Sequence, residues 1–535
     1  MENVSPLVIV IFGATGDLMA RKLIPALYAL YKEKAISGNL FIVGVGRREM
    51  TQDQFRELMA TAVQERLPKE FDLNVWGNLI DGMYYEQGYF EDSALYDRLV
   101  ATLARFDETM KACVPRFFYL ATPPEHYETI LTHLKTSKLA EGCGQGTTNF
   151  TRILIEKPFG KDLSTAQKLD ALLASIFEEK QIYRIDHYLG KETVQNILAF
   201  RFANGMFEPT WNAQFIDHIQ ITLSESLGVA SRGAFYDGVG ALRDVVQNHM
   251  LQMLALIAME QPRAFDPSYI RDARTRAMQS IIPIDPKKVG QFVVRGQYEG
   301  YAKEKQVEPH SQTETYVALK LELDGKRWKG VPFYLRTGKK LGRKVTEISI
   351  HYKKPIVCLA KPDPALRDTG DACLFPEKEV LRNVLSIRIQ PDDGVYLRLM
   401  VKKPGLGMKL TDTTMAFHYA QAFPDFNQPE AYEKLLLDAI NGDQTLFART
   451  DGIEVSWQLV TKILEGWSRV AGSYHHVAGH GPGSTGSRGV YSESSGGTRT
   501  APLYTYAPGS MGPKEADALV EKDGRHWFLH EDTVR

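Results

Sequence analysis

Two clusters of polar residues contain the side chains that could move a proton on a small anionic substrate. The first reads Asp-His-Tyr-Leu-Gly-Lys-Glu at 186–192, directly after the apolar run Ile182–Ile185. Open α/β sheets bind their ligands where strands end. His187, Tyr188 and Lys191 together offer an imidazole, a phenol and an ammonium group. This set could bind a phosphate dianion.

The second cluster reads Arg-Asp-Val-Val-Gln-Asn-His-Met-Leu-Gln at 243–252, within a stretch of helical pattern. A lone helical histidine is more often a structural residue than a catalytic one. Asp244 and His249 are five positions apart, which is about 140° around an α-helix. They share a pocket only if Asp244 lies at the start of that helix, and the spacing leaves this open.

A glycine loop near the N-terminus could bind a dinucleotide. The loop, Gly13-Ala14-Thr15-Gly16-Asp17-Leu18, follows the apolar run Leu7–Phe12 and opens a helical pattern over 17–31. Glycine there permits a tight turn and a close approach of the backbone to a pyrophosphate, whose charge faces the helix N-terminus. The third glycine of the usual fingerprint is missing, since Met19 or Ala20 stands near its place. A plain tight turn is the alternative.

The end of the next apolar run indicates which dinucleotide binds. Residues 44–48 read Gly-Val-Gly-Arg-Arg. NAD sites place an acidic residue there to bind the ribose hydroxyls. Arg47 would instead suit a 2′-phosphate, because a guanidinium matches phosphate geometry. The sequence favours NADP over NAD, with an exposed basic turn as the alternative.

The elements that must position these groups form two patterns. Apolar runs at 7–12, 40–45, 117–121, 153–155 and 182–185 alternate with helical segments such as 164–179. This pattern predicts a parallel, doubly wound sheet. Period-two alternation at 317–323, and again at 385–389 and 395–401 around a turn at 391–394, predicts an antiparallel sheet instead.

We therefore expect an α/β Rossmann-like domain over 1–186 and a larger α+β domain with a mainly antiparallel sheet over 187–535. Residues 473–500 are rich in Gly, Ser and His, which predicts a flexible insertion in the second domain. Its glycine spacing is similar to that of a P-loop but lacks the lysine.

Length and charge exclude several classes of protein. The 535 residues exceed the roughly 250–300 that one core holds. Lys plus Arg (64) balance Asp plus Glu (65), so no overall field recruits nucleic acid or a membrane surface.

No signal peptide or membrane span is evident, which predicts a cytoplasmic location. The four cysteines lack metal-ligand spacing, and we expect reduced thiols and no metal.

Several motifs together resemble the glucose-6-phosphate dehydrogenase family. They are GATGDLM at 13–19, EKPFG at 156–160, RIDHYLGKE at 184–192, RDVVQNHMLQ at 243–252 and RTGKKL at 336–341. The resemblance runs from about residue 7 to 472 and resumes at YAPGSMGPKEADAL, 506–519. The 473–500 insertion departs from the family pattern, and Met19 is a smaller departure.

The resemblance implies NADP-dependent oxidation of glucose 6-phosphate to its lactone. It assigns His249 as the general base, which suits a side chain whose reference pKa is about 6.5. Asp186 is implied to pair with this histidine. The substrate contacts that it implies are Lys157, His187, Tyr188, Lys191, Glu225, Asp244, Lys339 and Lys344.

The resemblance also implies cofactor contacts and an assembly. Tyr119 resembles a cofactor-contacting residue, and Lys157 matches the position where nicotinamide and sugar meet. Pro158 is similar to a proline that the family holds in the cis form. The large sheet is implied to form a dimer interface, so a homodimer or homotetramer is expected.

Two other functions remain as alternatives. Another NADP-linked sugar dehydrogenase could share the EKP motif, but it gives no reason for His187 and Lys191 as a phosphate site. A catalytically inactive dinucleotide-binding regulator would have no use for the Asp186 and His249 pair. A hydrolase is excluded, since we find no G-x-S-x-G elbow and no metal-ligand spacing.

Overall fold

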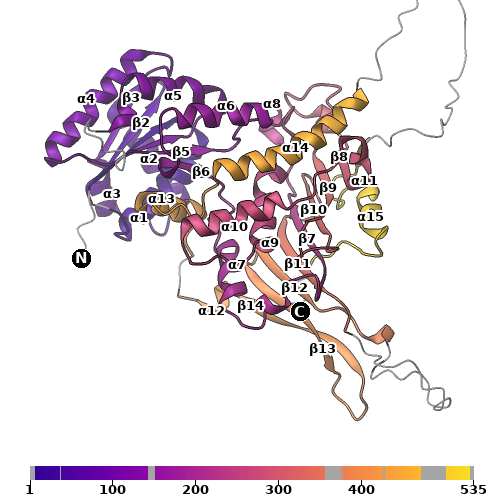
Figure 1. The fold of residues 1–535 in the computed structure, drawn as a ribbon. Coiled ribbons are helices and arrows are strands. Elements are labelled where there is room, and N and C mark those ends of the chain that lie inside the picture. The colour runs from indigo at the N-terminus through magenta and orange to yellow at the C-terminus, as the bar shows by residue number, and fades with distance from the viewer. Residues whose placement is uncertain are drawn as a thin grey trace, which may run out of the picture. The chain divides into compact units, whose positions relative to one another are not determined.

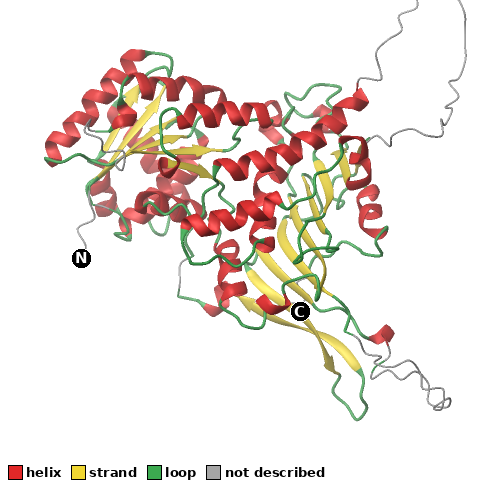
Figure 2. Cartoon of the chain, in the orientation of Figure 1, coloured by secondary structure: helices red, strands yellow, loops and turns green. Residues whose placement is uncertain are grey.

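The computed structural model describes residues 6–36, 38–142, 151–355, 375, 377–425, 428–471 and 502–530 (Figures 1 and 2). The chain divides into two compact units. The first comprises 1–196, 255–276 and 427–457, and the second comprises 197–254, 277–426 and 458–535. The first border thus follows residue 196, ten positions beyond the expected boundary, and two later segments return to the first unit. The predicted insertion at 473–500 lies outside the described residues.

The first unit contains a six-stranded sheet whose neighbouring strands are all parallel. Its order is β3-β2-β1-β4-β5-β6. The strands are β1 (Leu7–Phe12), β2 (Leu40–Gly46), β3 (Met83–Gln87), β4 (Arg116–Leu120), β5 (Thr151–Glu156) and β6 (Ile182–Ile185). The predicted doubly wound sheet is confirmed. The strand order reverses between β1 and β4, which is where such sheets bind ligands.

Two layers of helices cover this sheet (Figure 2). One layer contains α1 (Ile24–Lys32), α2 (Gln52–Arg66), α3 (Leu73–Ile80) and the returning α13 (Ala431–Asn441), and α1 packs against the other three. The other layer contains α4 (Ser93–Met110), α5 (Tyr127–Thr136) and α6 (Leu163–Ala174), with α5 against both its neighbours. The helical pattern over 164–179 thus gives a helix that ends at Ala174, and Glu179–Gln181 forms a separate 3₁₀ turn.

The second unit contains a nine-stranded sheet of order β14-β13-β12-β11-β7-β10-β9-β8-β15. Its strands are β7 (Ile216–Ser224), β8 (Val293–Tyr298), β9 (Tyr316–Leu321), β10 (Phe333–Gly338), β11 (Val345–Tyr352), β12 (Val384–Gln390), β13 (Gly394–Lys402), β14 (Leu410–His418) and β15 (Leu503–Tyr506). The predicted, mainly antiparallel sheet is confirmed. Two pairs depart from it, because β7 with β10 and β8 with β15 are parallel.

The helices of the second unit are short. They include α8 (Gly233–Tyr236), α11 (Val289–Phe292), α12 (Tyr419–Ala422), α15 (Lys514–Glu521) and the π-helix η8 (Leu242–Met250). Four of the five unit borders fall within helices, namely α7 (Glu192–Phe202), α9 (Leu251–Ala258), α10 (Pro267–Gln279) and α14 (Thr450–Ala471). Among the residues described, no helix combines the length and apolar character that crossing a bilayer requires.

One expectation about the cysteines is wrong. Cys113 takes part in a disulfide, whereas the sequence predicted reduced thiols. The spacing of the cysteines in the sequence could not predict this disulfide, because a disulfide depends on which loops the fold brings together. The other three cysteines, at 143, 358 and 373, lie outside the described residues.

Candidate active site

The glycine loop lies at the point where the order of the parallel sheet reverses. Gly13 directly follows β1, has a φ of +85° and donates its N–H to the Val45 carbonyl at 2.9 Å. A β-carbon there would come within 2.7 Å of the Ala121 carbonyl, beyond β4. Only glycine therefore fits between the two strand ends. The N–H of Gly16 turns back to the Gly13 carbonyl at 2.9 Å.

The rest of the loop leads into a helix. Ala14 is fully buried, whereas Gly16 and Asp17 are exposed. Asp17 forms an ion pair with Arg21 at 3.0 Å on the next helical turn. This turn, η1 (Met19–Leu23), is a π-helix that continues into α1. The tight turn and the following helix fit a dinucleotide pyrophosphate, as the sequence predicts.

Arg47 lies on the exposed segment after β2. The phenol of Tyr85 donates to the carbonyls of Gly46 and Arg48, at 3.0 and 2.6 Å, and so fixes the backbone on both sides of Arg47. No ion pair involves the Arg47 guanidinium among the described residues. This strand end adjoins the glycine loop, because both Gly13 and Ala14 donate to Val45. A 2′-phosphate bound at this strand end could therefore pair with the Arg47 guanidinium, which forms no ion pair with a carboxylate of the described residues.

The end of β5 contributes a buried carboxyl and a lysine. Glu156 is the last residue of β5, and Lys157 is joined to Pro158 by a cis peptide bond, as the resemblance implies. Tyr119 on β4 is fully buried, and its hydroxyl donates to Glu156 Oε1 at 2.6 Å. The sequence selected Tyr119 and Lys157 but did not select Glu156.

The predicted phosphate-binding residues lie on one loop between β6 and α7. Asp186 is 2% exposed, and its Oδ1 accepts the backbone N–H of Tyr188 at 3.0 Å. The His187 and Tyr188 rings lie 5.0 Å apart, and Lys191 Nζ lies 5.7 Å from the Tyr188 ring centre. The structure therefore places the imidazole, the phenol and the ammonium group of the predicted set beside one another.

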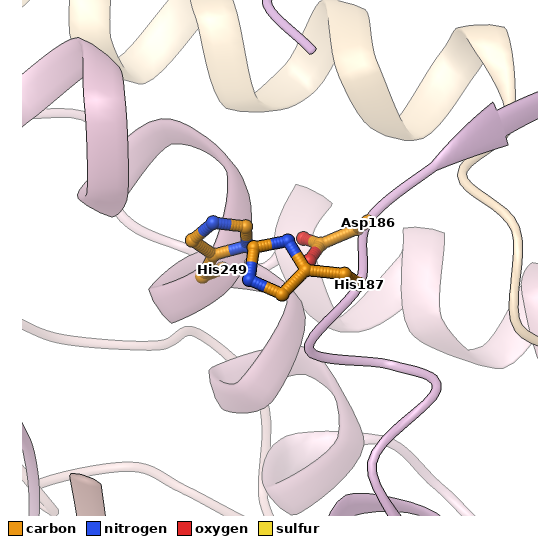
Figure 3. A group of neighbouring side chains, drawn as sticks. All are labelled: Asp186, His187 and His249. Atoms are coloured by element: carbon orange, nitrogen blue, oxygen red, sulfur yellow. The ribbon is translucent and has the colours of Figure 1, made fainter. Parts of the chain in front are cut away.

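The helix that contains His249 differs from the one that the spacing assumed. Residues Leu242–Met250 form the π-helix η8, in which hydrogen bonds join residues five apart. Asp244 and His249 therefore lie about one turn apart, and not on diverging faces of an α-helix. His249 is 2% exposed. Figure 3 draws His249 on this helix, with Asp186 and His187 on the segment that follows β6.

Three of the predicted substrate contacts gather in the second unit. Lys339 forms an ion pair with Glu225, and its Nζ lies 3.8 Å from Asp244 Oδ2 and 4.9 Å from the Tyr236 ring centre. Glu225 follows β7 and Lys339 follows β10, and these strands pair in parallel with Ser224 opposite Gly338. The two side chains therefore emerge from the same edge of the sheet.

Lys344 does not join this group in the structure. It is exposed just before β11 and, among the described residues, makes no ion pair with Glu225 or Asp244. Its predicted contact with substrate remains a prediction.

Sequence reasoning missed the buried carboxyl that supports η8. Glu314 is 4% exposed, and its Oε1 accepts the N–H of Leu242, the first residue of the π-helix, at 3.0 Å. Burial raises the pKa of this carboxyl above its usual value. No local signal marks Glu314, since it lies 72 positions from Leu242.

Comparisons with known proteins agree with this arrangement. Residues 10–196 match the family model "Glucose-6-phosphate dehydrogenase, NAD binding domain", and 198–528 match "Glucose-6-phosphate dehydrogenase, C-terminal domain". The chain is 42% identical to glucose-6-phosphate 1-dehydrogenase of Chlamydia pneumoniae, over 98% of this chain and 96% of that one. It is 40% identical to the same enzyme of Treponema pallidum, over 99% and 97%.

Solved structures agree as well. One is glucose-6-phosphate dehydrogenase in complex with its substrate glucose-6-phosphate, with a TM-score of 0.81, 30% identity, and coverage of 99% of this chain and 100% of that chain. Another is glucose-6-phosphate 1-dehydrogenase from Mycobacterium avium, with a TM-score of 0.74, 32% identity, and coverage of 98% and 99%. The family models, the relatives and the solved structures all extend over nearly the whole chain, and the chain therefore belongs to the glucose-6-phosphate dehydrogenase family.

Proposed function

We propose that the chain oxidises D-glucose 6-phosphate to 6-phospho-D-glucono-1,5-lactone and reduces NADP to NADPH. The observation that carries this proposal is the loop after β6, where His187, Tyr188 and Lys191 lie together at the ligand-binding edge of a dinucleotide-binding sheet. These groups suit a phosphate, and a sugar phosphate needs such a site at the end remote from the reacting carbon.

In this proposal His249 is the general base. One of its ring nitrogens takes the proton of the anomeric hydroxyl while C1 loses its hydride, so that the C1–O bond becomes a carbonyl. NADP, when bound, supplies the hydride acceptor. Asp186 would pair with the other ring nitrogen, fix the tautomer and stabilise the imidazolium that forms. The roles of both residues rest on the family resemblance and on their burial.

The remaining groups would bind and orient the two ligands. Lys339, Glu225 and Asp244 form one charged cluster, whose carboxylates and ammonium group can accept from and donate to sugar hydroxyls. Gly13 and the helix that starts at the glycine loop would bind the pyrophosphate. Arg47 would bind the 2′-phosphate and so favour NADP over NAD. Lys157 and Tyr119 would lie toward the nicotinamide.

The family resemblance also leads us to propose a homodimer or homotetramer. In the second unit, Met415 and Phe417 on β14 and the nearby Leu406 and Met408 are exposed. Exposed apolar groups of this kind mark interfaces between proteins. A sedimentation experiment would give the mass of the assembly. A cytoplasmic location stays a prediction.

Initial rates with NADP and with NAD, each with glucose 6-phosphate and with glucose, test the proposal. We expect the highest kcat/KM for glucose 6-phosphate with NADP. Equal use of glucose and glucose 6-phosphate would favour another sugar dehydrogenase. Dinucleotide binding without turnover would favour the inactive regulator.

A further inference from the structure

The last residue of β5 is a carboxyl that the mechanism above does not use. The hydroxyls of Tyr119 and Tyr432 both donate to Glu156 Oε1, at 2.6 and 3.1 Å, and the hydroxyl of Tyr127 donates to the Glu156 carbonyl at 2.9 Å. One carboxyl oxygen thus binds two phenols from distant parts of the chain, β4 and α13.

The two phenols lie next to residues that are proposed to bind different ligands, the cofactor for Tyr119 and the substrate phosphate for Tyr432. Tyr119 belongs to the strand end expected to contact the cofactor. The Tyr432 ring lies parallel to the His187 imidazole, with 12° between the planes and 6.3 Å between the centres. Glu156 therefore binds two phenols, one on the strand expected to contact the cofactor and one whose ring lies beside His187 of the proposed phosphate-binding loop.

The titratable groups around Glu156 show which side chain of this cluster changes its protonation near neutral pH. Tyr119, Tyr432, Lys157 and Asp186 face the carboxyl, and Tyr127 faces the Glu156 carbonyl. Burial raises the pKa of Tyr119, Tyr127 and Tyr432 above the usual phenol value, so these groups stay protonated and remain donors at neutral pH. Burial also raises the pKa of the Glu156 carboxyl to about 7, although both phenol hydrogen bonds and Lys157 oppose this rise.

Protonation changes what Glu156 can accept. The ionised carboxylate accepts from both phenols through charge-assisted hydrogen bonds, which are about twice as strong as neutral ones. The protonated acid holds a hydrogen of its own and accepts more weakly. The positions of Tyr119 and Tyr432 are therefore fixed more firmly above the pKa of Glu156 than below it.

We infer that Glu156 is a positioning residue for the dehydrogenase reaction, whose ionised carboxylate holds Tyr119 and Tyr432 in place and so couples cofactor binding to sugar-phosphate binding. This inference rests on the proposed function. It assigns Glu156 no contact with the reacting atoms. Its effect should fall on the Michaelis constants of both ligands more than on kcat.

Glu156→Gln tests the inference, because glutamine keeps an acceptor oxygen in place and removes the charge. Rates of the full-length parent and variant are measured from pH 6 to 8.5. We expect the parent-to-variant ratio of kcat/KM to be about 3- to 30-fold at pH 8.5, because two charge-assisted hydrogen bonds become neutral. The ratio should approach one at pH 6, where the parent carboxyl is also neutral.

The ratio removes titrations that the parent and the variant share, such as that of the substrate phosphate. Glu86→Gln is the matched control, since Glu86 on β3 also accepts a hydroxyl, that of Thr102 at 2.9 Å, in the same sheet. Its ratio to the parent should stay near one throughout. A Glu156→Gln ratio that does not change with pH would overturn the inference.

Two further variants keep the inference testable if Glu156→Gln does not fold. Tyr432→Phe and Tyr119→Phe each remove one donor that stabilises the ionised carboxylate. In each variant the midpoint of the pH profile should lie at higher pH than in the parent. A midpoint equal to that of the parent in both variants would overturn the inference. An inactive parent would instead contradict the proposed function, so the two failures are distinguishable.

Discussion

The two units position their polar side chains through the same sheet geometry but at very different distances along the chain. In the first unit the phosphate-binding candidates occupy a single loop, directly after β6. In the second unit Glu225 and Lys339 are 114 positions apart and meet only because β7 and β10 pair in parallel. Parallel strands bring their carboxyl ends to the same edge of a sheet. One parallel pair within a mainly antiparallel sheet is enough to build this cluster.

The chemical roles proposed for the units differ as well. The first unit provides the binding groups for a phosphate and a dinucleotide, whereas the second provides the histidine proposed to take the proton. Changes at the ligand-binding residues of the first unit should therefore alter Michaelis constants, whereas changes at His249, or at Asp186, which is proposed to pair with it, should alter turnover. Each prediction below tests one side of this division.

The largest effect is expected at His249. His249→Asn keeps a polar group in the π-helix and removes the base, so kcat should fall by roughly 10²–10⁴-fold. Substrate should still bind, since its phosphate is proposed to contact His187 and Lys191. Asp186→Asn should lower kcat less, because it disturbs the base without removing it. Turnover per folded site, together with a binding titration, checks both variants.

A structural role for His249 makes a different prediction. If His249 is instead a packed core residue, replacing it would lower the stability and the amount of folded enzyme, while the molecules that do fold would keep the parental turnover. His526→Asn is the control, since that side chain is 81% exposed. A folded, substrate-binding His249→Asn protein with parental kcat would contradict the mechanism.

A smaller effect is expected at Lys191. Lys191→Ala removes a positive charge from the phosphate-binding loop, so the KM for glucose 6-phosphate should rise by roughly 10- to 150-fold. The kcat should change little, because the phosphate is bound equally in the ground and transition states. Use of free glucose should not change further. Lys168→Ala, on the exposed face of α6, is the control. If glucose turnover fell as steeply, Lys191 would act at the reacting end instead.

The smallest effect on the natural reaction is expected at Arg47, when NADP is saturating. Arg47→Ala should weaken NADP binding by about 1.5–3 kcal/mol and leave NAD binding nearly unchanged, because only NADP carries the 2′-phosphate. Titration with each dinucleotide measures this difference, and Arg66→Ala at the end of α2 is the control. Equal weakening of both dinucleotides would show that Arg47 binds a group common to them.

The amino-acid sequence by itself determined most of the first unit. β1 and β6 have the predicted bounds, and the glycine loop, the paired arginines and the Asp-His-Tyr-Leu-Gly-Lys segment each lie directly after a strand. Such groups can be recognised in a sequence because the binding residues directly follow the strand that positions them. Buried parallel strands also read as continuous apolar runs, which are distinct in any sequence.

Tertiary structure alone decided how the second unit and the Glu156 cluster are assembled. The parallel pairing of β7 with β10 joins segments that no local pattern relates, and Glu156 meets Tyr432 across 276 positions. The π-helical form of η8, which moves Asp244 and His249 toward one face, is likewise absent from the residue spacing. Sequence periodicity reports local geometry, whereas these arrangements depend on which distant surfaces pack together, and that is settled only when the whole chain folds.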